Sequence, residues 1–200
     1  MDYLLSRITH LSRERKVEFQ RFHSVRIMQQ HRQHTRWKPP DQGSFKVNYD
    51  GAILVAQGRA SLGVVIRNSN GAVMASLTQQ IPNPTTMAQV EALAARRAVE
   101  FALEIGITLA IFEGDSDTIT KDLNNLEPSL ALHGHLIQDV KLLESFFNCI
   151  NSVHVHCQGN NVAHSLDRPA LNSPSLMVWM EDVPPEISCF VQADLSSFVK

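Results

Sequence analysis

Three acidic residues occupy positions where a carboxylate is expected to have an unusual environment. Asp50 ends an alternating, strand-like stretch that starts at Phe45, and Gly51 follows it. An Asp-Gly pair after a strand most often forms a turn. Asp50 is therefore a candidate functional residue only in combination with Glu91 and Asp115. Three clustered carboxylates repel one another unless a cation lies between them. Their chemistry therefore depends on whether the fold brings them together.

Glu91 lies in a pattern that predicts a helix at about 87–105. Thr86 to Gln89 has the form of a capping box that opens this helix, and Gly106 closes it. On a helical projection, Glu91 falls about 40° from Met87, inside the apolar stripe and away from the other charges. A carboxylate in that stripe is costly to desolvate unless a cation or hydrogen-bond donor meets it. We therefore expect Glu91 to have such a partner and not to be an ordinary surface glutamate.

Asp115 follows an apolar stretch, residues 107–112, that is typical of a strand buried inside a sheet. Two interpretations stay open for this aspartate. It can be the N-cap of a short helix that runs to about Leu123. Alternatively it belongs to a ligand site, because ligands of open α/β sheets gather at the carboxyl ends of strands.

Hydrophobic patterns predict the other elements of the fold. Strands at about 59–68 and 72–80 join the first strand, at about 44–51, in an antiparallel meander, because Asn70-Gly71 between apolar runs is a strong hairpin signal. The later elements are a loop at 124–133, a helix at about 134–147, a fifth strand at 152–157 and a last helix at 162–168, which Pro169 stops or kinks.

The histidines and cysteines of the C-terminal part lack the spacing of a metal site. His154 and His156 share one face of the fifth predicted strand, and a half-exposed strand face explains them better than metal binding because no third ligand is nearby. Cys149, Cys157 and Cys189 are odd in number and scattered, which fits free thiols in a reducing compartment. No apolar run approaches the roughly 18 residues that span a bilayer, and the N-terminus lacks a signal peptide's apolar region. We expect a soluble intracellular protein with no membrane partner, in the nucleus or the cytoplasm.

Charge and composition predict one domain with two extensions. Residues 1–38 contain nine Lys or Arg and three Asp or Glu, a charge of +6, which leaves 9 − 17 = −8 for the remaining chain. Two prolines and a glycine in the stretch 37–43 break any helix and mark a boundary. We expect a basic, weakly helical extension at 1–38, a domain at 39–171 and a tail at 172–200 that packs on the domain or on a partner. The extension is either the contact for a polyanion or simply a solvated basic helix.

The order βββ-α-β-α-α-β-α, with acids at the positions given above and a polar residue in the last helix, resembles the ribonuclease H fold. This is an α/β fold with a mixed five-stranded sheet, antiparallel in strands 1-2-3 and parallel in strands 4 and 5, flanked by helices. More narrowly, the chain resembles plant reverse-transcriptase-like ribonuclease H domains derived from non-LTR retroelements. The segments that carry this resemblance are 37–40, 46–52, 63–67, 113–116 and 159–166.

The resemblance implies cleavage of the RNA strand of RNA/DNA hybrids by two divalent metal ions. It implies that Asp50 bridges both ions, that Glu91 and Asp115 complete one site, and that the last-helix position helps the other. Hard Mg²⁺ prefers carboxylate oxygens, and two ions about 4 Å apart can activate a water and stabilise the leaving oxygen. The expected cofactor is Mg²⁺, or Mn²⁺, and the expected partner is an RNA/DNA hybrid or another nucleic acid. The oligomeric state stays open.

This chain departs from the family pattern at the fourth position, where His164 stands in place of the usual aspartate. Imidazole suits Mn²⁺ or Zn²⁺ better than Mg²⁺ and adds no negative charge, so a second metal ion should be held more loosely. Asp167, one turn further, is an alternative ligand. Pro169 interrupts the last helix, and residues 124–133 lack the Lys and Arg of the basic protrusion with which some ribonucleases H grip hybrid.

Three functions therefore compete. The first is a metal-dependent endonuclease with Asp50, Glu91 and Asp115 as metal ligands and His164 as a weaker fourth ligand or a proton shuttle. The second is a catalytically weakened nucleic-acid-binding domain of retroelement origin. The third is a domesticated scaffold whose tail and extension bind proteins. We favour the first, because a carboxylate on an apolar helix face accompanies aspartates at two strand ends.

Overall fold

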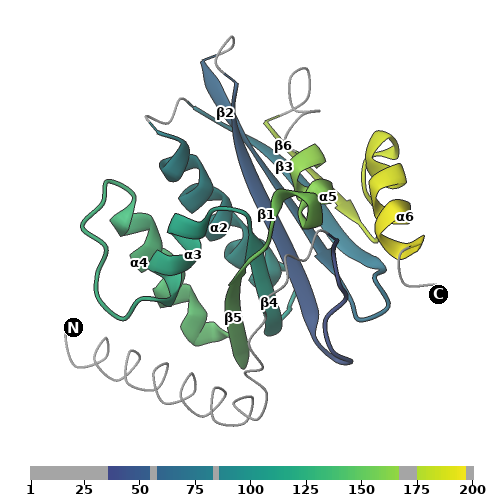
Figure 1. Ribbon diagram of the computed structural model, residues 1–200, viewed down its shortest axis with the longest axis horizontal. Helices are drawn as coiled ribbons and strands as arrows, with labels where there is room; N and C mark the ends of the chain where they lie inside the picture. Colours follow the sequence, from purple (N-terminus) through teal and green to yellow (C-terminus); the bar gives the residue numbers. More distant parts are fainter. Residues whose placement is uncertain (1–35, 55–57, 83–85, 167–174, 197–200) are drawn as a thin grey trace.

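The computed structural model describes four ranges of the chain, namely 36–54, 58–82, 86–166 and 175–196. These residues form a six-stranded sheet in the order β5-β4-β1-β2-β3-β6 (Figure 1). The strands are β1 Phe45–Leu54, β2 Arg59–Arg67, β3 Val73–Pro82, β4 Leu109–Gly114, β5 Cys149–His154 and β6 Leu176–Met180. The pairs β1–β2, β2–β3 and β3–β6 are antiparallel, whereas β4 runs parallel to both β1 and β5. The mixed α/β sheet predicted from the sequence is thus confirmed, with six strands instead of five.

Helices cover both faces of this sheet. They are α2 Met87–Glu104, α3 Asp117–Asn124, α4 Gly134–Leu143, α5 Asn161–Leu166 and α6 Ser188–Ser196. Successive strand residues point to opposite faces, so Val64 belongs to the large core under α2, α3 and α4, whereas Val65 belongs to a smaller core with α5 and the C-terminal segment. Figure 1 shows α2, α3 and α4 on one side of the sheet and α5 and α6 on the other.

Helix α2 forms as its sequence pattern predicts. Thr86 is the N-cap, and its side chain accepts a hydrogen bond from the Gln89 backbone N–H at 3.2 Å. The apolar stripe, which includes Val90 and Phe101, is buried against the sheet. The backbone N–H of Gly106 then bonds to the Leu103 carbonyl as the chain leaves the helix.

Several predicted boundaries are wrong, and strand pairing explains most of them. Strand β1 continues to Leu54 because it pairs with β2 as far as Arg59, so Asp50 lies inside the strand and not at its end. Strand β5 covers 149–154 because its residues pair with β4 from Leu109 onward. The predicted helix at 134–147 ends at Leu143 and continues as a short 3₁₀ turn.

The C-terminal segment adds two elements that the sequence did not predict. Strand β6 pairs with β3, with Val178 opposite Leu77, and α6 packs with Val191 against the smaller core. This part of the tail therefore packs on the domain, which was one of the two predicted alternatives. Across the described ranges, the structure contains no helix with the length and apolar character needed to cross a membrane. The predicted extension at 1–38 lies almost entirely outside the described residues.

Candidate active site

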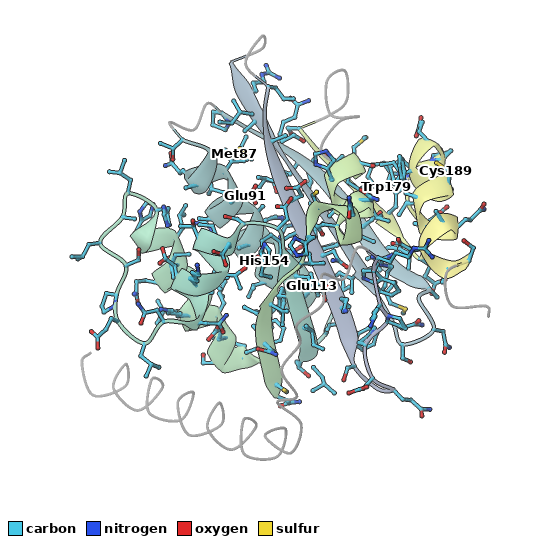
Figure 2. All side chains as sticks on the ribbon, viewed as in Figure 1. Met87, Glu91, Glu113, His154, Trp179 and Cys189 are labelled. Carbon is cyan, nitrogen blue, oxygen red and sulfur yellow. The ribbon has the colours of Figure 1, made fainter. Side chains whose placement is uncertain are left out.

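The structure brings the three predicted acids together. Asp50 on β1, Glu91 on α2 and Asp115 after β4 each offer a carboxylate oxygen, and these oxygens lie within 4.8 Å of one another. In the ranges that the structure describes, this is the one such cluster of potential metal ligands. Asp50 and Glu91 are buried, with 3% and 6% of their surface exposed. In Figure 2, Glu91 lies between α2 and β1, close to the centre of the sheet.

Gly51 explains how α2 comes close enough to β1 for this contact. A Cβ atom at Gly51 would meet the Val90 Cγ1 atom at 2.6 Å and the Val90 carbonyl oxygen at 3.2 Å. Only glycine allows this approach without displacement of the helix. Because Glu91 follows Val90, the same approach places its carboxylate next to Asp50. The Asp-Gly pair thus lies within strand β1, where Gly51 lets helix α2 pack closely, and it does not form a turn.

Asp115 is not a helix cap. The N-cap of α3 is Ser116, whose side chain accepts a hydrogen bond from the Ile119 backbone N–H. Strands β1 and β4 are parallel, so their carboxyl-terminal parts lie at the same end of the sheet. This geometry carries Asp115, just beyond β4, toward Asp50.

The carboxylates influence one another electrostatically. Burial raises the pKa of Asp50 to about 6, and repulsion from Asp115 adds to this effect, while a hydrogen bond with His164 opposes it. Burial also raises the pKa of the Tyr49 phenol, with the negative charges of Glu91 and Asp115 as further causes. A site that disfavours negative charge to this extent in the protein alone is one in which a bound cation is strongly favoured.

His164 lies beside the carboxylates and bonds directly to Asp50. Its Nδ1 atom is 2.6 Å from Oδ2 of Asp50. The other oxygen of Asp50, Oδ1, accepts a hydrogen bond from the Gly51 backbone N–H at 2.8 Å. The cluster of potential metal ligands therefore consists of the three carboxylates, with His164 bonded to its most buried member. Asp167, the predicted alternative ligand, lies outside the described residues.

One histidine at this site was not predicted to belong to it. His154 is the last residue of β5 and lies opposite Gly114, and its Nε2 atom is 3.0 Å from the Asp115 carbonyl oxygen. The parallel pairing of the fourth and fifth strands could have revealed this position, because it places the end of the fifth strand beside Asp115. His156 lies beyond the end of the strand and is exposed, but its ring packs edge to face on that of His154, with the ring centroids 5.4 Å apart.

Comparisons with known proteins agree with this geometry. A family model described as "Reverse transcriptase-like" matches residues 48–169. RNase H1 from the archaeon Halobacterium salinarum is 25% identical, with a TM-score of 0.60, and the match covers 65% of this chain and 98% of that one. The N-terminal RNase H domain of Rv2228c from Mycobacterium tuberculosis is 22% identical, with a TM-score of 0.58, covering 64% of this chain and 94% of that one.

A third solved structure contains a ligand. LC11-RNase H1, isolated from compost by a metagenomic approach, was solved in complex with an RNA/DNA hybrid; it is 24% identical, with a TM-score of 0.52, covering 64% of this chain and 96% of that one. The comparison with curated proteins found no match. The family model spans more than half of the chain, and the fold is that of the ribonucleases H. The chain therefore belongs to the reverse transcriptase-like family.

Proposed function

We propose that this protein is a metal-dependent endonuclease that cleaves the RNA strand of RNA/DNA hybrids. The observation that carries the proposal is the convergence of three carboxylate oxygens within 4.8 Å, two of them from buried residues. Membership in the reverse transcriptase-like family and the ribonuclease H fold support a nuclease of this type. The solved neighbour that binds an RNA/DNA hybrid supports the choice of substrate.

The donor set fits a hard divalent cation. Asp50, Glu91 and Asp115 supply only carboxylate oxygens, the ligands that Mg²⁺ and Mn²⁺ favour. When bound, the ion supplies a water of lowered pKa and stabilises the charge that develops on the phosphate oxygens. The three carboxylates would hold the ion, and Asp50 is expected to orient it, since Asp50 belongs to the cluster and is bonded to His164.

His164 has one of two roles in this proposal. His164 is bonded to Asp50 Oδ2, so it would compete with a second metal ion for this carboxylate. It is therefore either a weak fourth ligand, once its ring turns away from Asp50, or a group that moves a proton at Nδ1 during cleavage. As a ligand, His164 would favour Mn²⁺ over Mg²⁺ because imidazole accepts Mn²⁺ more readily. In either role it adds no negative charge, so a second ion would be held less tightly than the first.

The bond between His164 and Asp50 also favours a second candidate function. If the second ion never binds, the domain binds hybrid but turns it over poorly. Hybrid binding without cleavage in either metal, with an affinity that falls steeply with salt, distinguishes this outcome from the first.

Hybrid cleavage in Mg²⁺ and in Mn²⁺ tests the proposal. We expect Asp50→Asn to lower the cleavage rate at least about 100-fold, because the residue with the central position in the cluster loses its charge. Asp139→Asn is the matched control, since Asp139 lies on α4 and pairs with the exposed Arg96. Cleavage that survives Asp50→Asn at the rate of the control would rule out the proposed site.

We also propose an origin and a domain organisation. The motifs around Trp37, Asp50 and His164 support derivation from a non-LTR retroelement domain of the plant type. We propose that residues 39–171 form the nuclease domain, that the extension at 1–38 contacts the polyanion, and that the tail at 172–200 packs on the nuclease domain.

A further inference from the structure

Beneath the candidate active site, one face of the sheet buries polar side chains where a core normally has apolar ones. Lys46 and Asn48 alternate along β1 with Val47 and Tyr49 of the large core, so they share the face that carries Asp50. The buried residues that form the polar network on this face have the following exposed fractions: Lys46 7%, Asn48 0%, Arg67 1%, Glu113 8% and Asn160, which packs onto the face, 0%. Such burial is costly unless the groups satisfy one another.

Asn48 lies at the centre of this network and uses its full hydrogen-bonding capacity. Its Oδ1 atom accepts from Trp37 Nε1 at 2.8 Å and from Arg67 Nη2 at 3.2 Å. Its Nδ2 atom donates to Glu113 Oε2 at 3.0 Å and to Asn160 Oδ1 at 3.2 Å. These partners fix the orientation of the Asn48 amide. If the amide were flipped, its NH₂ group would face the donors of Trp37 and Arg67, and its oxygen would face the acceptors of Glu113 and Asn160.

Asn160 connects this network to the candidate active site. Its Nδ2 atom donates to the Tyr49 carbonyl at 2.9 Å, so both ends of its amide are bonded to β1 immediately before Asp50. Its own carbonyl accepts from the His164 backbone N–H at 3.0 Å, which closes the first turn of α5. A six-residue helix has little stability of its own. The Asn160 amide therefore sets where α5 lies on β1, and with it the contact between His164 and Asp50.

The C-terminal helix completes the network from the other side. Asp194 of α6 pairs with Arg67 through Oδ2 and Nη1 at 2.6 Å. The Arg67 guanidinium also stacks on the Trp37 ring, 3.5 Å from its centroid. Without Asp194, the buried Arg67 loses the acid that it bonds directly and keeps only the electrostatic attraction of Glu113, so we expect it to shift and weaken its bond to Asn48.

We propose that Asn160 is a positioning residue for the candidate active site, and that helix α6 takes part in this positioning through Asp194, Arg67 and Asn48. The chain of contacts runs from the C-terminal helix to the bond between His164 and Asp50. The C-terminal segment thus helps to hold the site residues in place. This inference rests on the proposed function only for the catalytic role of those residues.

The test compares two acid-to-alanine changes in the C-terminal segment of the full chain. Asp194→Ala breaks the network at its end on α6, away from the carboxylates of the candidate active site. Glu186→Ala removes an exposed acid of the same segment. Hydrogen exchange of the His164 amide, followed by NMR, reports the bond to Asn160 directly. We expect exchange at His164 to become about tenfold faster in Asp194→Ala, as for the loss of one net hydrogen bond, with little change at the amides of β2.

A second readout is the affinity for Mn²⁺, measured by calorimetry without nucleic acid. We expect Asp194→Ala to weaken Mn²⁺ binding about three- to tenfold and Glu186→Ala to leave it unchanged. Asn160→Ala should have a larger effect than Asp194→Ala on both readouts. If Asp194→Ala behaves like Glu186→Ala in exchange at His164 and in Mn²⁺ affinity, the inference is wrong.

A paired change covers the case in which Asp194→Ala does not fold. Arg67→Met combined with Asp194→Leu removes both buried charges at similar volume, which proteins often tolerate. Asn48 still loses a donor, so exchange at His164 should again become faster than in the wild type, and unchanged exchange would overturn the inference.

Neither readout requires cleavage. A wild-type protein that binds Mn²⁺ but cleaves no hybrid contradicts the proposed function alone, and cleavage that is indifferent to Asp194→Ala contradicts the inference alone.

Discussion

Asp50 shows how a functional side chain can lower the stability of its own fold. Its pKa is raised from 3.8 to about 6 in the folded, metal-free protein, chiefly by burial. Between these two pH values, the folded state binds more protons than the unfolded chain. The stability associated with protonated Asp50 is therefore fully present below the unfolded pKa of 3.8 and is lost as the pH rises through about 6.

Asp50→Asn should consequently stabilise the metal-free protein while it abolishes cleavage. We expect the free energy of unfolding near pH 8 to rise by about 1–3 kcal/mol, since two pKa units correspond to roughly 3 kcal/mol. The gain should shrink toward zero at about pH 3, where Asp50 is largely protonated in both states. Urea unfolding with a chelator at the two pH values measures this difference. A variant that is less stable than the wild type near pH 8 contradicts the assigned environment of Asp50.

His164→Asp tests what the histidine does at the fourth position. The substitution removes the Nδ1 contact with Asp50 and adds a carboxylate, so a second Mg²⁺ should bind more tightly. We expect cleavage in Mg²⁺ to rise about tenfold and the preference for Mn²⁺ to fall, because the site gains a charge that Mg²⁺ favours. His164→Asn is the control for loss of the imidazole alone. Slower cleavage in His164→Asp than in the wild type would favour the proton-moving role.

At the scale of elements, local signals predicted the first half of the fold well. The β1–β2–β3 meander and helix α2 were predicted because hairpin residues, a capping residue and an apolar stripe are all encoded within a few positions. The convergence of Asp50, Glu91 and Asp115 was predicted from the resemblance to the ribonuclease H fold, since these residues lie far apart along the chain. Asn160 was not predicted as part of the site, since the meaning of a buried amide depends on partners far along the chain.

Elements that depend on strand partners were predicted less well. The start of β5 is misplaced by three residues because its pairing with β4, not its own alternation, sets the boundary. Strand β6 is a five-residue apolar run that becomes a strand by pairing with β3. No local signal separates such a run from an apolar loop.

Gly51→Ala tests the proposed reason for the close approach of α2. The added methyl group would meet Val90 Cγ1 at 2.6 Å, so the helix must shift and take Glu91 away from Asp50. We expect a loss of about 1–3 kcal/mol in stability and a weaker affinity for Mn²⁺. Unfolding curves and calorimetry measure the two effects. Combining the change with Val90→Ala should recover part of both losses, and a fully tolerated Gly51→Ala would contradict this packing argument.

At the scale of the whole molecule, the described domain offers few cations for gripping a nucleic acid. Many of its Lys and Arg side chains are in ion pairs with acids of the same domain: Lys46 with Glu113, Arg67 with Asp194, Arg96 with Asp139, Arg97 with Glu104, and Lys121 with Asp117. The extension at 1–38 contains an excess of six positive charges. We therefore propose that the domain binds the metal ion and that the extension binds the phosphate backbone of the nucleic acid.

Deletion of residues 1–35 tests this division and keeps Trp37 in the buried network. We expect hybrid affinity to fall at least about tenfold near 100 mM salt and the salt dependence to become shallower, because fewer counterions are released on binding. Fluorescence anisotropy with a chelator present measures both quantities. The affinity for Mn²⁺ should not change. An unaltered salt dependence would show that the domain itself makes the phosphate contacts.

The central claim is that three carboxylates from three elements form one divalent-cation site. Anomalous diffraction from crystals of the full chain soaked in Mn²⁺ tests it most directly. We expect a manganese peak within coordination distance of Asp50, Glu91 and Asp115 together, and the loss of this peak in Asp50→Asn. Manganese bound elsewhere, with the three carboxylates turned away from one another, would contradict it.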